Sequence, residues 1–309
     1  MATSALIGEC TLELQGSWVD AWKFEKALMR CGDALGSLYH TIVIRVPSGC
    51  SLMIDVIIRL LSFCNQAVAC TKRVRLEFGE ASRALGYLNR IGFFDHLAPA
   101  VEVTPHRPIF SGAAIHRGGN RGLVEIERFS PDKPVEQNLV PRLVAAVTRG
   151  CSARSDVTEI GDAMYSIFGE LVKNVFDHSR TNLDAYAALQ TYPQGNRVTV
   201  AVSDSGIGIL SSLRPALRGG KWDNLSDVDL VVEIFREGIS SKPEDKRGMG
   251  LKSSARHAIG FRADLDVRLL NQRVLLKPSN NEYQPNMAYS QDQLPLLWGT
   301  HIAFSFKLD

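Results

Sequence analysis

The sequence predicts two globular parts, an α/β part followed by an α+β part whose helices cover one face of a mixed sheet. One observation is the length of 309 residues, which suggests about two domains. A second is that strand-like and helix-like segments alternate in the first third of the chain. A third is that the second half places long helical segments before two adjacent strand-like runs.

Apolar periodicity predicts the elements of the first part. The β-branched run at Thr41–Val46 and the run at Arg73–Phe78 have the length and composition of strands. A further short strand is expected at 11–14. Helices are expected at 18–35, directly after a Ser51 cap, and at 81–91. Strands separated by helices imply a parallel or mixed sheet that helices cover.

Proline and glycine residues concentrate between the two parts, at 99–133, and indicate a connector. A short strand is expected within it, at Leu123–Phe129. We therefore expect an N-terminal domain at 1–110, a connector at 111–136 and a C-terminal domain at 137–309.

The second part contains a predicted antiparallel hairpin, because a YPQGN turn separates the strand-like runs 185–191 and 197–203. The polar, glycine-rich stretch 210–246 is typical of a mobile lid. The other expected elements are helices at 137–149, 158–178 and 250–259, and strands at 265–270 and 301–308.

Charge and hydropathy exclude several classes of protein. The 35 Lys and Arg residues nearly balance 33 Asp and Glu residues, so the net charge favours neither nucleic acid nor an anionic membrane as a partner. No apolar run reaches the roughly 18–20 residues of a membrane span, and the first ten residues do not resemble a secretory signal. The six cysteines contain no Cys-x-x-Cys pair. We expect a cytoplasmic protein with buried, reduced thiols and no zinc site.

Three segments of the second part carry groups suited to chemistry. In the first, Glu170, Asn174 and His178 are spaced four residues apart and would form one polar stripe along a helix. Such a stripe can place a general base beside a metal-binding carbonyl oxygen. A solvated helix face is the equally weighted structural alternative.

In the second segment, a strand leads into Asp204, which is followed by Gly206 and Gly208. Glycine permits positive φ and a close approach of the backbone to a ligand. An aspartate held at the end of a strand can accept a hydrogen bond from an exocyclic amine. The structural alternative is a tight turn in which the aspartate caps the next helix.

In the third segment, Gly248-Met249-Gly250 directly precedes a predicted helix. The free N–H groups and the helix dipole favour an anion such as phosphate at this position. Lys242, Lys246, Arg247 and Lys252 add positive charge. The structural alternative is a flexible basic loop.

The order and spacing of these three segments resemble the GHKL superfamily, the ATP-binding domains of gyrase, heat-shock chaperones, histidine kinases and MutL. The resemblance covers roughly 137–309, and the segment WGTHI at 298–302 is similar to the Gly-Thr and strand that end the family's domain. It implies a Bergerat-type sandwich that binds ATP with Mg²⁺.

At the adenine end, the resemblance implies that Asp204 accepts a hydrogen bond from the adenine amino group, with Thr300 nearby. Gly206 and Gly208 would shape the floor of the adenine pocket.

At the phosphate end, the resemblance implies that Asn174 binds Mg²⁺ and that Glu170 is the general base. Asp177 and His178 would lie near the ribose and phosphates. The remaining implied phosphate contacts are Lys242, Arg247, Gly248, Met249, Gly250 and Leu251.

The N-terminal half has a fainter resemblance to STAS-like domains, the fold of anti-sigma-factor antagonists, in its turn at 48–51 and in the segments 85–88 and 91–97. It implies an interaction domain. The acidic residues that precede the family's phosphorylated serine are replaced here by Arg45-Val46-Pro47, so a structural role for Ser48 and Ser51 is favoured.

Three functions follow as hypotheses. The first is a slow ATPase that acts as a nucleotide-driven switch on a protein partner. The N-terminal half would contact this partner, and a homodimer of the chain is a further option. The second is a protein serine kinase of the anti-sigma-factor type. The third is an interaction module that holds ATP without hydrolysing it, in bacterial stress or phage-defence signalling.

Overall fold

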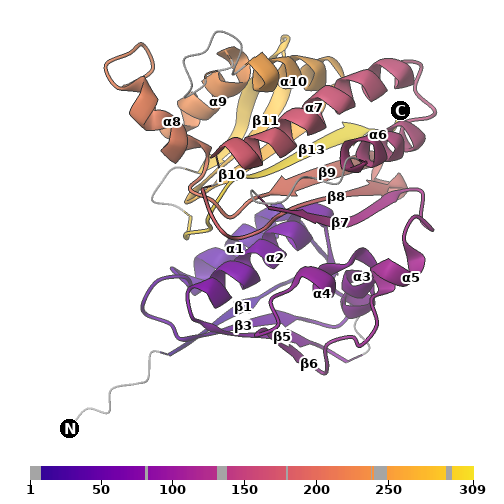
Figure 1. Ribbon diagram of the computed structural model, residues 1–309, viewed down its shortest axis with the longest axis vertical. Coiled ribbons are helices and arrows are strands. Elements are labelled where there is room, and N and C mark those ends of the chain that lie inside the picture. The colour runs from indigo at the N-terminus through magenta and orange to yellow at the C-terminus, as the bar shows by residue number, and fades with distance from the viewer. Residues whose placement is uncertain are drawn as a thin grey trace.

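The computed structural model describes residues 8–80, 83–130, 138–178, 180–237, 239, 249–289 and 294–309. The chain is a mixed α/β protein (Figure 1). Its strands are β1 (Glu9–Glu13), β2 (Trp18–Val19), β3 (Thr41–Val46), β4 (Ser51–Leu52), β5 (Arg73–Phe78), β6 (Glu102–Thr104), β7 (Leu123–Phe129), β8 (Ala185–Tyr192), β9 (Arg197–Ser203), β10 (Asp264–Leu269), β11 (Gln272–Ser279), β12 (Glu282–Tyr289) and β13 (His301–Lys307). Its helices are α1 (Ala21–Cys31), α2 (Ile54–Ala69), α3 (Arg83–Ile91), α4 (Phe93–His96), α5 (Gly112–His116), α6 (Leu139–Gly150), α7 (Val157–His178), α8 (Ile209–Leu217), α9 (Asp227–Glu237) and α10 (Met249–Gly260), with a 3-10 turn at Pro193–Gly195.

A parallel sheet underlies the N-terminal half. Within the described residues its strand order is β1-β3-β5-β6, and its pairings are parallel. Helices α1 and α2 lie on one side of it (Figure 1), which confirms the predicted parallel or mixed sheet covered by helices. The helix expected at 18–35 is shorter, because Trp18 lies in β2 and Asp20 caps α1 by accepting a hydrogen bond from the Lys23 N–H at 2.9 Å.

An antiparallel sheet forms the centre of the C-terminal half. Its order within the described residues is β12-β11-β10-β13-β9-β8-β7. The pairings found there are all antiparallel, so the expected mixed sheet is wrong. The reason is local connectivity, since β8–β9, β10–β11 and β11–β12 are joined by short turns that only antiparallel strands allow. The predicted hairpin is β8–β9, and the strand expected in the connector is β7, which pairs with β8.

The lid expected at 210–246 is wrong for the part of it that the structure describes. Helices α8 and α9 occupy Ile209–Leu217 and Asp227–Glu237. They bury apolar residues at helical spacing in the C-terminal core, including Leu213, Leu230 and Ile234. Residues 240–248 lie outside the described residues.

Both faces of the antiparallel sheet are covered. Helices α6, α7, α9 and α10 lie on one side, and α1 and α2 lie between the two sheets (Figure 1). The side chains of β9 alternate accordingly: Val200 and Val202 belong to the C-terminal core, whereas Ala201 packs in the core of the N-terminal half. The alanines Ala188, Ala201 and Ala303 on this second face leave room for α2 to approach closely.

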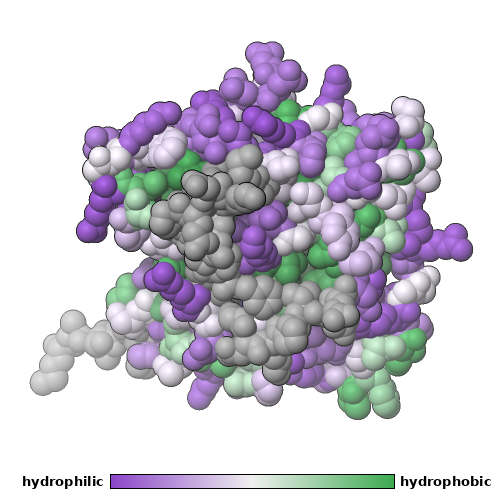
Figure 2. Space-filling view, turned by 45° about the horizontal axis from the view of Figure 1, so that its top comes forward, coloured by the Kyte–Doolittle hydropathy of each residue, from purple (hydrophilic) through white to green (hydrophobic). Residues whose placement is uncertain are grey.

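The surface and the cysteines agree with a globular chain. On the face shown in Figure 2, hydrophilic residues are interrupted by small, separated hydrophobic areas. All six cysteines are free thiols, and five of them are buried. Within the described ranges, no helix combines the length and the apolar character needed to cross a membrane.

Candidate functional site

A small pocket lies between α7, the end of β9 and the start of β13, and it contains three of the predicted site residues, Asn174, Asp204 and Thr300. Its free volume is about 20 Å³, which is room for about one water molecule. A larger ligand therefore enters only if the surrounding side chains move apart. The described residues that line it are Leu171, Asn174, Val175, Val202, Asp204, Ile209, Thr300 and Ile302.

Asp204 is the buried acid of this pocket, with 6% of its surface exposed. Its Oδ1 accepts a hydrogen bond from the Gly206 N–H at 2.8 Å. Burial raises the pKa of the Asp204 carboxyl to about 6, although hydrogen bonds from Gly206 and Thr300 favour the ionised form. The aspartate closes a turn, as the structural alternative expected, but α8 is capped by Gly208 and not by Asp204.

Two glycines allow the segments around Asp204 and Thr300 to meet. Gly208 and Gly299 both have positive φ, +78° and +100°, a region that favours glycine. A Cβ atom on Gly208 would lie 3.3 Å from the Gly299 carbonyl oxygen. The Thr300 hydroxyl accepts a hydrogen bond from the Ile209 N–H at 3.1 Å, which ties the start of α8 to β13.

The α7 residues differ in their surroundings. Asn174 is partly buried, and its Nδ2 is a buried donor without a hydrogen-bond partner among the described residues. Such a group is rare in folded proteins and is commonly satisfied by water or a ligand. Glu170, one turn earlier, is 29% exposed and lies 3.9 Å from the Lys173 ammonium. The alternative that this stripe is a solvent-exposed helix face therefore does not hold for Asn174, because its amide nitrogen is buried.

The remaining predicted phosphate contacts lie at the edges of the described structure. Asp177 and His178 are the last two residues of α7. Met249, Gly250 and Leu251 are the first three residues of α10, so the helix begins one residue before the expected start and includes two of the residues expected to precede it. Lys242, Arg247 and Gly248 lie outside the described residues.

Several residues next to the pocket lie in the segments that the sequence singled out, but were not themselves expected to be site residues. Ser203 and Ser205 flank Asp204, while Trp298 and His301 lie close to Thr300, and side chains of α2 hydrogen-bond to this set. Their contact with α2 had no sequence signal, because α2 reads as an ordinary apolar helix.

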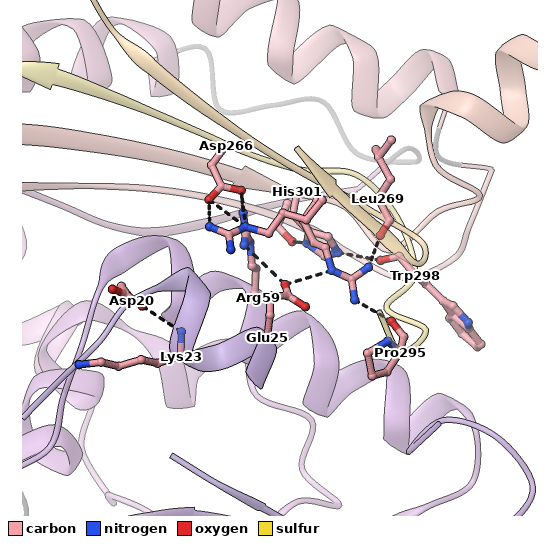
Figure 3. A network of polar contacts seen from close by, with 12 residues as sticks. Asp20, Lys23, Glu25, Arg59, Asp266, Leu269, Pro295, Trp298 and His301 are labelled. Carbon is pink, nitrogen blue, oxygen red and sulfur yellow. Dashed lines mark hydrogen bonds and ion pairs between the residues drawn. The ribbon is translucent and has the colours of Figure 1, made fainter. Parts of the chain in front are cut away.

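A buried ionic network joins α1 and α2 to β10 and β11 (Figure 3). The Arg268 Nε donates to Glu25 Oε1 at 3.0 Å, and Arg59 Nη2 donates to Asp266 Oδ1 at 2.9 Å. Arg273 also pairs with Asp266, at 2.6 Å. Burial alone would raise the pKa of Asp266, but Arg59 and Arg273 outweigh it and hold that pKa below its usual range. The network fixes the N-terminal half against the sheet behind the pocket.

Comparison with known proteins adds no assignment: no family model matches this chain, and no curated protein matches it.

Proposed function

We propose that the chain binds Mg·ATP in the pocket of Asn174, Asp204 and Thr300, and that it is a slow ATPase acting as a nucleotide-driven switch on a protein partner. The observation that carries the proposal is that α7, β9 and β13 bring these three residues into one pocket. The GHKL resemblance assigned them to the same ligand from three distant parts of the sequence.

The adenine end fits a base that offers an exocyclic amine. A carboxylate that is ionised at pH 7 is a strong hydrogen-bond acceptor, and burial strengthens its interaction with a donor. The surrounding Val202, Ile209 and Ile302 are apolar and suit the faces of a purine ring. A guanine would present a carbonyl oxygen where adenine presents its amine, so Asp204 would repel it.

The phosphate end fits a metal-bound triphosphate. The Asn174 amide, whose Nδ2 has no partner among the described residues, could place its carbonyl oxygen on Mg²⁺, which takes one or two protein ligands and keeps waters and phosphate oxygens. The metal would neutralise the charge that develops on the phosphates. Glu170 would orient a water molecule and accept its proton, and the N–H groups at the start of α10 would face phosphate oxygens.

Contact between the two halves supports a switch. Helix α2 of the N-terminal half packs on the sheet behind the pocket (Figure 1). A ligand that opens the pocket would therefore change the surroundings of α2, and a protein partner or a second copy of the chain on the N-terminal half would detect that change.

The test is ATP binding and phosphate release by the full chain with Mg²⁺. Glu170→Ala should bind ATP like the wild type and lose turnover by about 10²–10⁴-fold. Glu159→Ala is the matched control, because Glu159 is an exposed acid on the same helix, and it should keep both properties.

The other outcomes separate the alternatives. Phosphate from labelled ATP that appears on a protein serine would favour the kinase. Binding without turnover in every variant would favour the ATP-holding module. A wild-type chain that binds no nucleotide would overturn the proposal.

A further inference from the structure

Helix α2 belongs to the N-terminal half, yet its buried polar residues hydrogen-bond to the segments that carry Asp204 and Thr300. Gln66 and Ser62 are fully buried. They lie one turn apart on the side of α2 that faces the antiparallel sheet, where they contact the end of β9, the segment just after it and the residues just before β13.

The Gln66 side chain pairs with the backbone of Trp298 in both directions. Its Oε1 accepts from the Trp298 N–H at 2.9 Å, and its Nε2 donates to the Trp298 carbonyl oxygen at 2.9 Å. The same Nε2 donates to the Ser205 hydroxyl at 2.9 Å. Because a backbone N–H only donates and a carbonyl only accepts, the orientation of the amide is fixed. Gln66 thus connects the residue after Asp204 with the segment that leads to Thr300.

Ser62 makes a second connection of the same kind. The His301 Nε2 lies 3.0 Å from the Trp298 carbonyl oxygen, so this nitrogen carries the proton. Burial, and then Arg59 and Arg268, lower the pKa of His301 well below its usual value, so the ring is neutral. Its Nδ1 therefore accepts from the Ser203 hydroxyl, and that hydroxyl accepts from Ser62 at 2.8 Å.

We propose that Gln66 is a positioning residue of the nucleotide pocket, supplied by the N-terminal half, with Ser62 in a supporting role. This inference rests on the proposed function. Through these bonds α2 holds the residues on both sides of Asp204 and fixes their register against the segment that contains Thr300. Preorganised polar groups bind a ligand more tightly because they need not be ordered during binding.

If Gln66 has a purely structural role, its substitution and a substitution of the neighbouring Asn65 should affect nucleotide binding alike. Asn65 therefore distinguishes a structural role from a positioning role. Asn65 also joins α2 to the sheet, since its Nδ2 donates to the Tyr186 hydroxyl at 2.8 Å and its Oδ1 accepts from the Ala98 N–H at 2.8 Å. None of its partners flanks Asp204 or Thr300. Asn65→Leu therefore removes one hydrogen bond between the halves, to Tyr186, together with bonds inside the N-terminal half, without reaching the pocket.

The experiment titrates Mg·ATP and Mg·GTP into the full-length wild type, Gln66→Met, Ser62→Ala and Asn65→Leu, with thermal unfolding measured for each chain. Gln66→Met should weaken ATP binding by about tenfold and should reduce the preference for ATP over GTP. Ser62→Ala should weaken ATP binding by a smaller factor. Asn65→Leu should lower the melting temperature without changing either affinity by more than about twofold.

Each outcome of this titration either supports or overturns the positioning role of Gln66. Equal loss of affinity in Gln66→Met and Asn65→Leu, or no loss in Gln66→Met, overturns the positioning role while the proposed function stands. If Gln66→Met does not fold, Ser62→Ala serves in its place. The positioning role is then overturned if Ser62→Ala binds ATP, and prefers it over GTP, as the wild type does. Absence of ATP binding by the wild type overturns the proposed function and this inference with it.

Discussion

Gly299 lies so close to Asp204 that a Cβ atom at position 299 would be 2.0 Å from the Asp204 carbonyl oxygen. Real Cβ atoms do not come that close to backbone, and the φ of +100° at Gly299 adds a second constraint. The residue before Thr300 is thus required to be glycine so that Thr300 can approach Asp204.

Gly299→Ala should therefore destabilise the chain. Backbone strain alone should lower the free energy of unfolding by about 1–3 kcal/mol, and the clash should move Thr300 away from Asp204. Urea denaturation measures the effect. Gly86→Ala is the control, because Gly86 is an exposed residue inside α3 whose added Cβ would meet no described atom within 4 Å, and it should raise stability by about 0.5–1 kcal/mol.

Asp204→Asn should stabilise the protein at pH 7. The folded-state pKa of about 6 exceeds the value of about 3.9 expected in the unfolded chain. The folded state therefore holds the proton between these two values, and ionising the buried carboxyl costs about 3 kcal/mol above pH 6. Asparagine avoids that cost and can still accept the Gly206 hydrogen bond.

The gain from Asp204→Asn should be largest above pH 6 and should disappear as the pH falls towards 4. Urea denaturation at several pH values measures it, with the exposed Asp162→Asn on α7 as a variant of little effect. Lower stability of Asp204→Asn at pH 7 would show that the carboxylate is not strained in the folded chain.

Arg268→Met should be strongly destabilising. It leaves the fully buried Glu25 without its 3.0 Å partner, and removing one partner of a buried ion pair typically costs about 3–5 kcal/mol. Arg236→Met is the control, because Arg236 pairs with Glu233 and Glu282 at the exposed surface and such pairs contribute less than about 1 kcal/mol. Similar losses of unfolding free energy in the two variants would contradict the burial of the network.

His301 should make the fold less stable in acid. Burial holds the pKa of His301 in the folded chain well below the usual value of 6.5. Below pH 6.5 the unfolded chain therefore binds a proton at this residue before the folded chain does. The contribution of the neutral His301 ring to the free energy of unfolding is present above pH 6.5 and is lost as the pH falls below that value. In urea denaturation, the stability advantage of the wild type over His301→Gln should therefore shrink between pH 7 and pH 5.

The sequence predicted those elements that carry a strong local pattern. The β8–β9 hairpin follows from two strand-like runs around the YPQGN turn, and α7 follows from its long apolar periodicity. The helical spacing of Leu230, Ile234 and Phe235 in α9 was equally readable, but the expectation of a lid took precedence over it.

The packing of the N-terminal half against the C-terminal sheet could not be predicted from local sequence patterns. Alternation shows that Ala201 and Ser203 share one face of β9, but nothing in that pattern says that α2 of the N-terminal half packs there. Asn174, Asp204 and Thr300 were found because each lies in a motif of its own. Gln66 was missed because a single glutamine in an apolar helix carries no signal until its partners are seen.

The most direct measurement is the calorimetric binding of Mg·ATP and Mg·GTP to the wild type and to Asp204→Asn. We predict that the wild type prefers ATP, and that Asp204→Asn loses ATP affinity while it becomes more stable at pH 7, so that the loss cannot arise from unfolding. Equal ATP binding by both chains, or no binding by the wild type, would contradict the assignment of this pocket to adenine.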